Sequence, residues 1–182
     1  MRRHTAAAID FVRAKLIFRG HAIGRRVRVG PGVRISGDAG GKVSLGERVK
    51  IGRSCTIQFR DEGISPTLEV GNRTYLQSNV HIITALGVSI GADCAVSWNV
   101  TILGSDFHEI LEVDGTAKPV SAPIFIGNNV LVGAGASILK GTIIGDHCIV
   151  GAGAVVSGSF PPYSLIAGNP ARVIRQINGW RL

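Results

Sequence analysis

The sequence predicts an all-β fold, a parallel β-helix of six-residue units, and three observations point to it. The composition combines 45% hydrophobic with only 5% aromatic residues, and 25 of the 182 residues are glycine. This favours frequent turns over a helical bundle. An aliphatic residue recurs every six positions, and a small or β-branched residue follows it four positions later in most units. Neither the helical period of 3.6 nor the strand period of 2 fits this repeat.

The six-residue period corresponds to one short strand and one turn, so three units close a triangular coil of about 18 residues. Coils stack by parallel pairing, with the aliphatic and the small residue pointing inward. Gly often follows the aliphatic residue, and we expect it to supply the positive φ of a tight turn. The units predict roughly seven to eight coils. The clearest run of aliphatic residues is Ile126, Val132, Ile138, Ile144, Val150 and Val156.

All three cysteines fall on the small inward position of a unit. Their spacing fits no zinc-binding pattern, so no metal site is expected from them. We expect Cys55, Cys94 and Cys148 to be buried structural thiols.

A short helix is expected at residues 5–19, where Thr5 can cap it and apolar residues are mixed with basic ones. It would cover the open first coil, because a stacked repeat needs a cap. We therefore divide the chain into a basic N-terminal helix or cap at 1–24, a β-helix at 25–156, and a C-terminal region at 157–182.

The C-terminal region is expected to leave the repeat, because Pro161 and Pro162 cannot continue a strand ladder. Asn169 suits an N-cap and Pro170 suits the first helical position. The pattern therefore predicts an extension with a short helix at about residues 170–177.

Positive charge is concentrated towards the N-terminus. Residues 1–60 hold 14 basic and 3 acidic side chains, and the remaining residues hold 6 and 9. This end suits a solvated face, an anionic membrane surface or an acidic or phosphorylated partner. Nucleic acid is not expected, because aromatic residues are not interleaved with the basic ones. No long apolar stretch and no secretory signal is visible, so we expect a cytoplasmic protein, with peripheral membrane contact left open.

The repeat is interrupted most clearly at about residues 103–125, which we expect to project as a loop. An irregular segment of this length inside a regular stack is usually functional or disordered. It carries Asp106, His108 and Glu109 close together. It is therefore the first place to look for chemistry.

The stretch IGNNVLVGAGASILKGTIIGDHCIVGAGAVVSGSFPPYSLIAGNPARVIRQI resembles the C-terminal half of the hexapeptide-repeat acyltransferases. The segment GSDFHEI resembles the histidine loop of members that modify polysaccharides. The chain resembles in particular the branch of the galactoside, maltose, nodulation-factor and polysaccharide O-acetyltransferases, and the resemblance covers about residues 65–178. It implies a left-handed coil, which the repeat alone does not predict because parallel crossovers are generally right-handed.

The resemblance implies transfer of an acyl group, expected to be acetyl from acetyl-CoA, to a hydroxyl. His108, whose ring titrates near neutral pH, is the expected general base. Asp106 or Glu109 can hold the ring in the correct tautomer, and a backbone carbonyl can do the same. A backbone N–H of the segment Gly133-Ala134-Gly135 is the expected oxyanion donor.

The resemblance also places the pantetheine arm of CoA against small residues on the outer surface, Gly133, Ala134 and Ala152. Leu131 departs from the family, whose sugar acetyltransferases often have a tryptophan beside the arm. The expected phosphate ligands are Lys140, Arg172 and Arg175, with the two arginines on one face of the predicted helix.

For the acceptor, Asn79 aligns with a substrate-contacting asparagine of the sugar acetyltransferases, although a turn-forming asparagine fits the position equally. His81 and Trp98 fall in neighbouring coils. We expect the acceptor to be a sugar hydroxyl of a surface polysaccharide or glycan, with the nitrogen of an amino sugar as the alternative.

The resemblance further implies a homotrimer with active sites between subunits. Two other functions use the same fold class. A zinc carbonic anhydrase needs three converging histidines, and the five histidines here lack the expected spacing. A non-catalytic scaffold with a basic, anion-binding end remains the alternative from another class.

Overall fold

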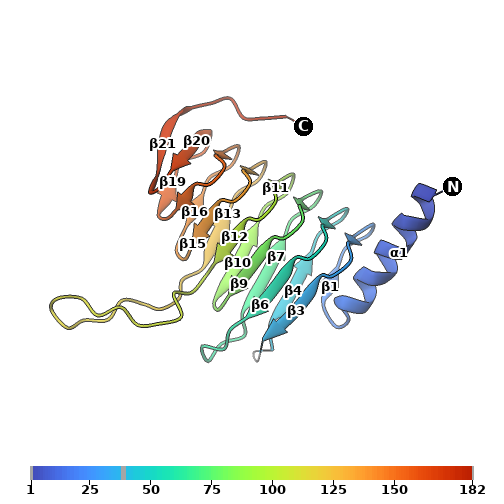
Figure 1. The fold of residues 1–182 in the computed structure, drawn as a ribbon, viewed down its shortest axis with the longest axis horizontal. Coiled ribbons are helices and arrows are strands. Elements are labelled where there is room, and N and C mark those ends of the chain that lie inside the picture. Colours follow the sequence, from blue (N-terminus) through green and yellow to red (C-terminus); the bar gives the residue numbers. More distant parts are fainter. Residues whose placement is uncertain (1, 38–39, 182) are drawn as a thin grey trace.

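The computed structural model describes residues 2–37 and 40–181, and the chain forms a parallel β-helix (Figure 1). Each turn contributes three short strands, and each strand pairs with its counterpart in the next turn, so that three sheets run along the axis. Two sheets have seven parallel strands and the third has six, which gives six full turns and a seventh with two sides. The predicted all-β solenoid is confirmed, with slightly fewer coils than expected.

The three sheets, called A, B and C here, are defined by their strands. Sheet A contains β1 (Ala22–Ile23), β4 (Lys42–Leu45), β7 (Thr67–Val70), β10 (Gly87–Ile90), β13 (Ile124–Ile126), β16 (Ile143–Ile144) and β19 (Ser159–Phe160). Sheet B contains β2 (Arg28–Val29), β5 (Lys50–Ile51), β8 (Tyr75–Leu76), β11 (Ala95–Val96), β14 (Leu131–Val132), β17 (Ile149–Val150), β20 (Ser164–Gly168) and β21 (Ala171–Gln176). Sheet C contains β3 (Arg34–Gly37), β6 (Thr56–Phe59), β9 (His81–Thr84), β12 (Thr101–Leu103), β15 (Ser137–Leu139) and β18 (Val155–Val156).

The core is the column of inward residues that the six-residue repeat predicts, and all of them are buried. At the small inward position, side chains also bridge coils: the Cys94 thiol donates to the carbonyl oxygen of Gly127 at 3.1 Å. Burial raises the pKa of Cys94 to about 11 and raises the pKa values of Cys55 and Cys148 as well. The expectation of buried structural thiols is confirmed.

The glycines that follow the inward aliphatic residues serve a purpose different from the predicted one. Gly91 and its equivalents do not have positive φ; the positive φ falls two residues later, at 58° for Asp93. A Cβ on Gly91 would lie 2.5 Å from the carbonyl oxygen of Gly127 in the next coil. The repeat therefore requires glycine for close stacking of backbones, and the turn prediction is wrong for these positions.

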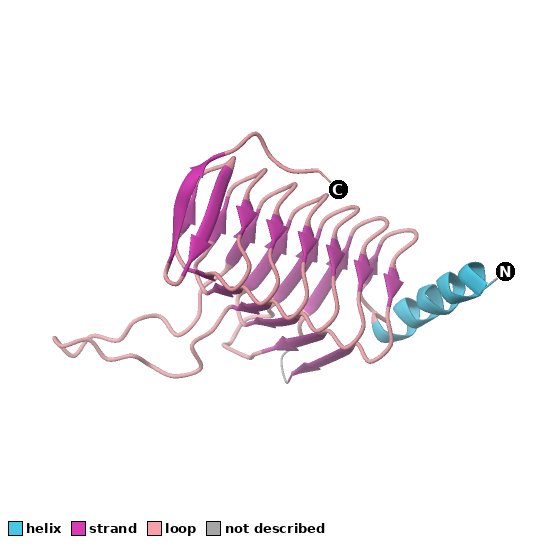
Figure 2. Cartoon of the chain, turned by 45° about the horizontal axis from the view of Figure 1, so that its top comes forward, coloured by secondary structure: helices cyan, strands magenta, loops and turns pink. Residues whose placement is uncertain are grey.

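Helix α1 (Arg2–Ile17) closes the N-terminal end of the coil (Figure 2). It begins earlier than predicted, so that Thr5 lies inside it and not at its N-cap. Ala14 and Phe18 are buried against the first coil, and the Arg13 guanidinium donates to the Val29 carbonyl at 2.9 Å. In the described part of the chain, no helix is long and apolar enough to span a bilayer.

The coil continues past the predicted boundary at residue 156, because β19 and β20 still pair in parallel with β16 and β17. Pro161 and Pro162 do not interrupt it, since both lie in the turn between these strands and not within a ladder. The coil therefore runs from Ala22 to Gly168, beyond the 25–156 range expected from the sequence.

The predicted helix at about 170–177 is wrong: these residues form β21, which pairs antiparallel with β20. β-branched Val173 and Ile174 suit a strand, and β21 supplies partners to the last open edge of sheet B. A bulge shifts the register, so Arg172 lies opposite Ala167 and Arg175 opposite Leu165. The bulge thereby leaves both arginines on the outer face.

Candidate active site

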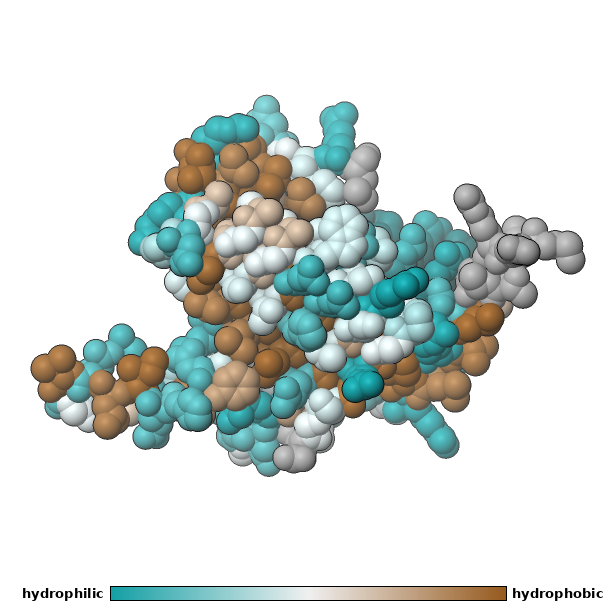
Figure 3. Space-filling view, viewed as in Figure 1, coloured by the Kyte–Doolittle hydropathy of each residue, from teal (hydrophilic) through white to brown (hydrophobic). Residues whose placement is uncertain are grey.

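The interruption of the repeat forms a long projecting segment, residues 104–123, between β12 and β13 (Figures 1 and 2). Its two arms run antiparallel, with bridges joining Ser105 to Ser121 and Leu111 to Ala117. The segment extends away from the coil, and large apolar side chains near its tip are exposed (Figure 3), with Val113 fully so. The predicted loop is present, as a two-armed extension.

Side chains of the coil hold the base of this projecting segment. The Lys140 ammonium lies 2.6 Å from the Asp106 carboxylate and also donates to the Pro119 carbonyl. Because Asp106 and Pro119 lie on opposite arms, Lys140 ties both arms to sheet C. The Arg60 guanidinium lies 4.6 Å from the centroid of the Phe107 ring. Nothing in the repeat pattern predicts the Arg60 contact, because it joins residues far apart in sequence.

The structure brings together two predicted site residues in contacts that the sequence does not anticipate. Asp106 is expected to orient His108, and Lys140 to bind phosphate, yet the two side chains form an ion pair with each other. His108 and Glu109 are exposed, and their side chains make no hydrogen bond within the described residues. The His108 ring can therefore meet a group from outside this chain, and the residue that orients it stays a prediction.

A second group of predicted residues stacks along the corner where sheet B turns into sheet C. At this corner a carbonyl of one coil accepts a hydrogen bond from an N–H of the next coil, as the Ala134 carbonyl does from the Gly153 N–H at 2.9 Å. Strand spacing separates successive members by about 4.8 Å. The equivalent position is occupied in successive coils by Arg53, Ser78, Trp98, Ala134 and Ala152, which we call the corner ladder.

In the part of the chain that the structure describes, the N–H groups of both small residues of the corner ladder, Ala134 and Ala152, have no backbone acceptor. A Cβ on Gly133 would lie 2.5 Å from the backbone nitrogen of Ala152, so Gly133 has a packing role. The N–H groups of Gly133 and Gly135 both donate to carbonyls of neighbouring coils. Within the residues described, the N–H of Ala134 has no backbone acceptor, so it is the amide of this segment that can face a bound group.

Asn79 lies in the turn beside the corner ladder, with φ of 59°, a region that asparagine tolerates well. Its side-chain amide is exposed and donates to Oδ1 of Asn99 at 3.2 Å. Its turn-forming role is therefore evident, and contact with an acceptor stays a prediction. His81 lies two residues later, with Nδ1 2.7 Å from the Thr56 hydroxyl oxygen.

Arg172 and Arg175 lie at the C-terminal end of the outer surface of sheet B. Both are exposed, and their strand partners Ala167 and Leu165 face outward beside the last coil. The two arginines share a face of strand β21. The expectation that they share a face rested on a helix, whereas the strand register and its bulge are what bring them to one side.

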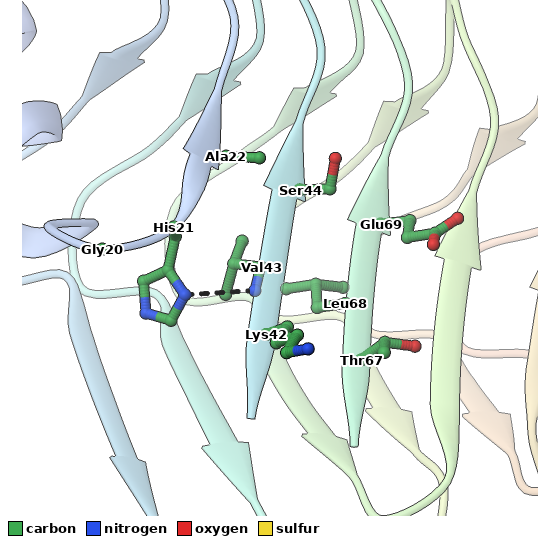
Figure 4. Close-up of a pocket in the computed structure, with 9 residues that line it drawn as sticks. All are labelled: Gly20, His21, Ala22, Lys42, Val43, Ser44, Thr67, Leu68 and Glu69. Carbon is green, nitrogen blue, oxygen red and sulfur yellow. Dashed lines mark hydrogen bonds between the residues drawn. The ribbon is translucent and has the colours of Figure 1, made fainter. Parts of the chain in front are cut away.

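A hollow of about 310 Å³ lies at the other end of sheet A (Figure 4). It is lined by residues of β1, β4 and β7, and His21 accepts a hydrogen bond from the Val43 N–H at 3.2 Å. Because β1 has only two residues, His21 supplies the acceptor that a longer strand would give. None of the predicted site residues lines this hollow, so we interpret it as a consequence of the incomplete first coil.

Metal-ligating side chains do not gather anywhere in residues 2–37 and 40–181: no group of three or more His, Cys, Asp or Glu could hold an ion. Within these residues, the arrangement offers an imidazole, a free amide and a surface of small residues.

Comparison with known proteins identifies the repeat and its relatives. Residues 123–158 match the bacterial transferase hexapeptide (six repeats) family. The galactoside O-acetyltransferase of Escherichia coli (strain K12) is 38% identical over 113 residues, which cover 61% of this chain and 55% of that protein. WbbJ of the same organism, named as a lipopolysaccharide biosynthesis O-acetyl transferase, is 29% identical over 147 residues, covering 76% of this chain and 74% of its own length.

Solved structures share the fold. The polySia-specific acetyltransferase NeuO matches with a TM-score of 0.72 at 24% identity, covering 89% of this chain and 78% of NeuO. A galactoside acetyltransferase in complex with coenzyme A matches with a TM-score of 0.53 at 28% identity, covering 81% of this chain and 66% of that one. The coil thus has the left-handed form of these acetyltransferases. The chain belongs to the hexapeptide-repeat transferase family, and its relatives include proteins named as galactoside and lipopolysaccharide biosynthesis O-acetyltransferases.

Proposed function

We propose that the protein transfers an acetyl group from acetyl-CoA to a sugar hydroxyl of a surface polysaccharide or glycan. The observation that carries this proposal is the exposed His108 on the projecting segment, in a coil whose relatives are named as O-acetyltransferases. The matched structure with bound coenzyme A supports CoA as the carrier of the group. The chain spans about half the length of the galactoside O-acetyltransferase, so the activity of the whole protein is part of the proposal.

His108 acts as the general base in this reaction. Its imidazole removes the proton of the sugar hydroxyl as the oxygen attacks the thioester carbonyl. The negative charge that forms on the carbonyl oxygen is stabilised by a backbone donor, for which we propose the N–H of Ala134, since it has no backbone acceptor in the described residues. The intermediate collapses to the ester and expels the CoA thiolate, which takes the proton back from the imidazolium.

CoA lies along the C-terminal half of the corner ladder. Ala134 and Ala152 present flat surface on successive coils, where a pantetheine arm can approach the backbone closely. Arg172 and Arg175, at the end of sheet B, bind the phosphates at the far end of the molecule. Lys140 is left out of this set, because binding phosphate would require breaking its ion pair with Asp106.

The active site is shared between chains of a homotrimer. The projecting segment leaves the coil where sheet C turns into sheet A, whereas the corner ladder lies where sheet B turns into sheet C. Sheet C therefore separates the two in one chain, and the segment extends away from the coil (Figure 1). A neighbouring chain that presents its corner ladder to His108 completes the site, and the exposed apolar tip suits contact with that neighbour.

The His108→Ala variant tests the role of the base. We expect turnover of acetyl-CoA with an acceptor to fall by about 10²–10⁴-fold, while CoA binding stays nearly unchanged. Unchanged turnover would exclude His108 from the reaction, and loss of CoA binding would point to a different role. Mild alkali cleaves an ester but not an amide, so alkali-stable product would favour N-acetylation, and no acetyl-CoA consumption would favour a scaffold.

A further inference from the structure

We propose that the acceptor is an acidic glycan, bound in a basic groove at the N-terminal end of the corner ladder. This inference rests on the proposed function and names the chemistry of its acceptor: a saccharide carrying carboxylate or phosphate groups. The groove, called the basic groove here, has a volume of about 380 Å³ and is lined by Arg28, Lys50, Arg53, Tyr75 and Ser78, among others.

Unpaired positive charge is the first feature of the basic groove. Arg28 and Lys50 are direct partners across parallel β2 and β5, an arrangement of like charges that costs stability. Both are exposed, as is Arg53, and none of the three has a carboxylate partner within the described residues. Asp10 is the one acidic residue in the lining, and it is paired with Arg13 at 2.8 Å.

Two arginines at another corner of the coil, outside the basic groove, are paired with carboxylates. Where sheet A turns into sheet B, Arg73 forms two 2.6 Å hydrogen bonds with Asp93, and Arg25 lies 2.9 Å from Glu47. The coil thus neutralises Arg73 and Arg25, whereas Arg26 and Arg48 at the same corner, like the cations of the basic groove, have no carboxylate partner in the described residues. An anionic ligand would relieve the repulsion between stacked cations and gain charge-assisted hydrogen bonds.

The position of the basic groove connects it to the proposed reaction. The backbone N–H of Asn79 donates to the carbonyl oxygen of Arg53 at 3.0 Å, so Arg53 lies one coil from the predicted acceptor residue. Going along the same corner, Trp98 follows Ser78, and then come the small residues assigned to the CoA arm. In this proposal the acceptor glycan lies at the N-terminal end of the corner ladder, and acetyl-CoA lies at its C-terminal end.

The lining favours a saccharide over a lipid headgroup as the anion's carrier. Tyr75 continues the Arg28–Lys50 row, and the Lys50 ammonium lies 5.8 Å from its ring centroid. An aromatic ring with hydroxyl and amide groups beside it, from Ser78 and Asn79, offers stacking and hydrogen bonds to a sugar. A phosphatidylserine headgroup has no sugar ring that could stack on Tyr75.

The test measures glycan binding without acetyl-CoA. The probes are an oligogalacturonate, which carries carboxylates, its carboxyl-reduced neutral counterpart, and a phosphorylated oligomannoside. We expect at least one acidic probe to bind more tightly than the neutral one, with an affinity that falls as salt is added. Arg53→Gln should weaken that binding about 10-fold, as expected for the loss of one charged hydrogen bond.

Arg48→Gln is the matched control. It removes the same charge from an exposed position on the other corner, outside the basic groove. We expect it to change binding less than about twofold, because screened charges at a distance contribute little. Equal weakening by Arg48→Gln and Arg53→Gln, or equal binding of neutral and acidic probes, would overturn the proposal.

Two further outcomes separate this inference from the proposed function. If His108→Ala abolishes transfer while Arg53→Gln leaves acidic-glycan binding unchanged, the basic groove is not the acceptor site although the enzyme stands. If Arg53→Gln weakens acidic-glycan binding in a protein that shows no transfer, the groove stands without the proposed reaction. If Arg53→Gln weakens binding to phosphatidylserine vesicles but not to either acidic probe, the groove is a lipid site and the inference is wrong.

Discussion

Glycine follows the inward aliphatic residue because the backbone of the next coil passes directly beside it. A Cβ on Gly91 would lie 2.5 Å from the Gly127 carbonyl oxygen, and the same close approach recurs along the repeat. The neighbouring atoms belong to the backbone of a stacked coil, so they cannot move aside without disturbing the ladder.

We therefore expect Gly91→Ala to lower the free energy of unfolding by about 1–3 kcal/mol, the usual cost of overpacking. Gly40→Ala is the control, because a Cβ there meets no atom within 4 Å. The melting temperatures of the two variants provide the measurement. A Gly91→Ala variant as stable as the Gly40→Ala variant would mean that stacking does not require glycine.

At this scale the sequence predicts which residues point inward, because hydrophobic periodicity depends only on the repeat. It does not predict why Gly91 is glycine, since a turn with positive φ and close stacking of successive coils both favour glycine. It also does not predict the partner of Asp106, because the ion pair with Lys140 joins positions 34 residues apart whose separation in space depends on the whole coil.

The projecting segment is the element on which the proposed chemistry depends, and Lys140 fixes its base. The ammonium contacts Asp106 on one arm and the Pro119 carbonyl on the other. A small displacement of a catalytic group can cost up to about 100-fold in rate, so the position of His108 depends on this brace.

The Lys140→Ala variant distinguishes a brace from a phosphate ligand. We expect its turnover to fall roughly 10–100-fold with CoA affinity unchanged, because the arms lose their common anchor. Isothermal titration with CoA and steady-state kinetics give the two quantities. Weakened CoA binding with normal maximal turnover would instead support the phosphate contact predicted from the sequence.

The two ends of the chain show what local patterns can and cannot predict at the scale of elements. The N-terminal helix follows from its own sequence, and its cap role from the need to cover an open coil. The C-terminal strand β21 does not follow from its own sequence, because Asn169-Pro170 also suits the start of a helix. The unpaired edge of β20 decides in favour of the strand, and that edge exists only once the coil continues past Pro162.

The outer surface of α1 carries an exposed apolar stripe. Ile9, Val12 and Leu16 are exposed and lie three and four positions apart, so they form an apolar stripe opposite the buried face. Contact between this end of the molecule and a membrane, which the basic charge leaves open, is not part of the proposed function.

The whole molecule presents its functional features in separate places around one prism. The projecting segment leaves one corner, the corner ladder lies on another, and the basic groove opens at the N-terminal end of that ladder. The sequence predicts the prism and the loop, because both follow from the period of six and its interruption. It does not predict the separation of these features, which is a property of the closed coil and leads to the proposal of a site shared between chains.

Mixing two inactive variants tests the shared site most directly. His108→Ala removes the base, and Ala134→Trp blocks the corner ladder that is to receive the base of a neighbour. After denaturation and refolding together in equal amounts, random trimers should regain about a quarter of the wild-type activity, since a site between two chains is intact only when each supplies its unmodified half. Mixed trimers that form but show no activity above that of the separate variants would contradict a site shared between chains.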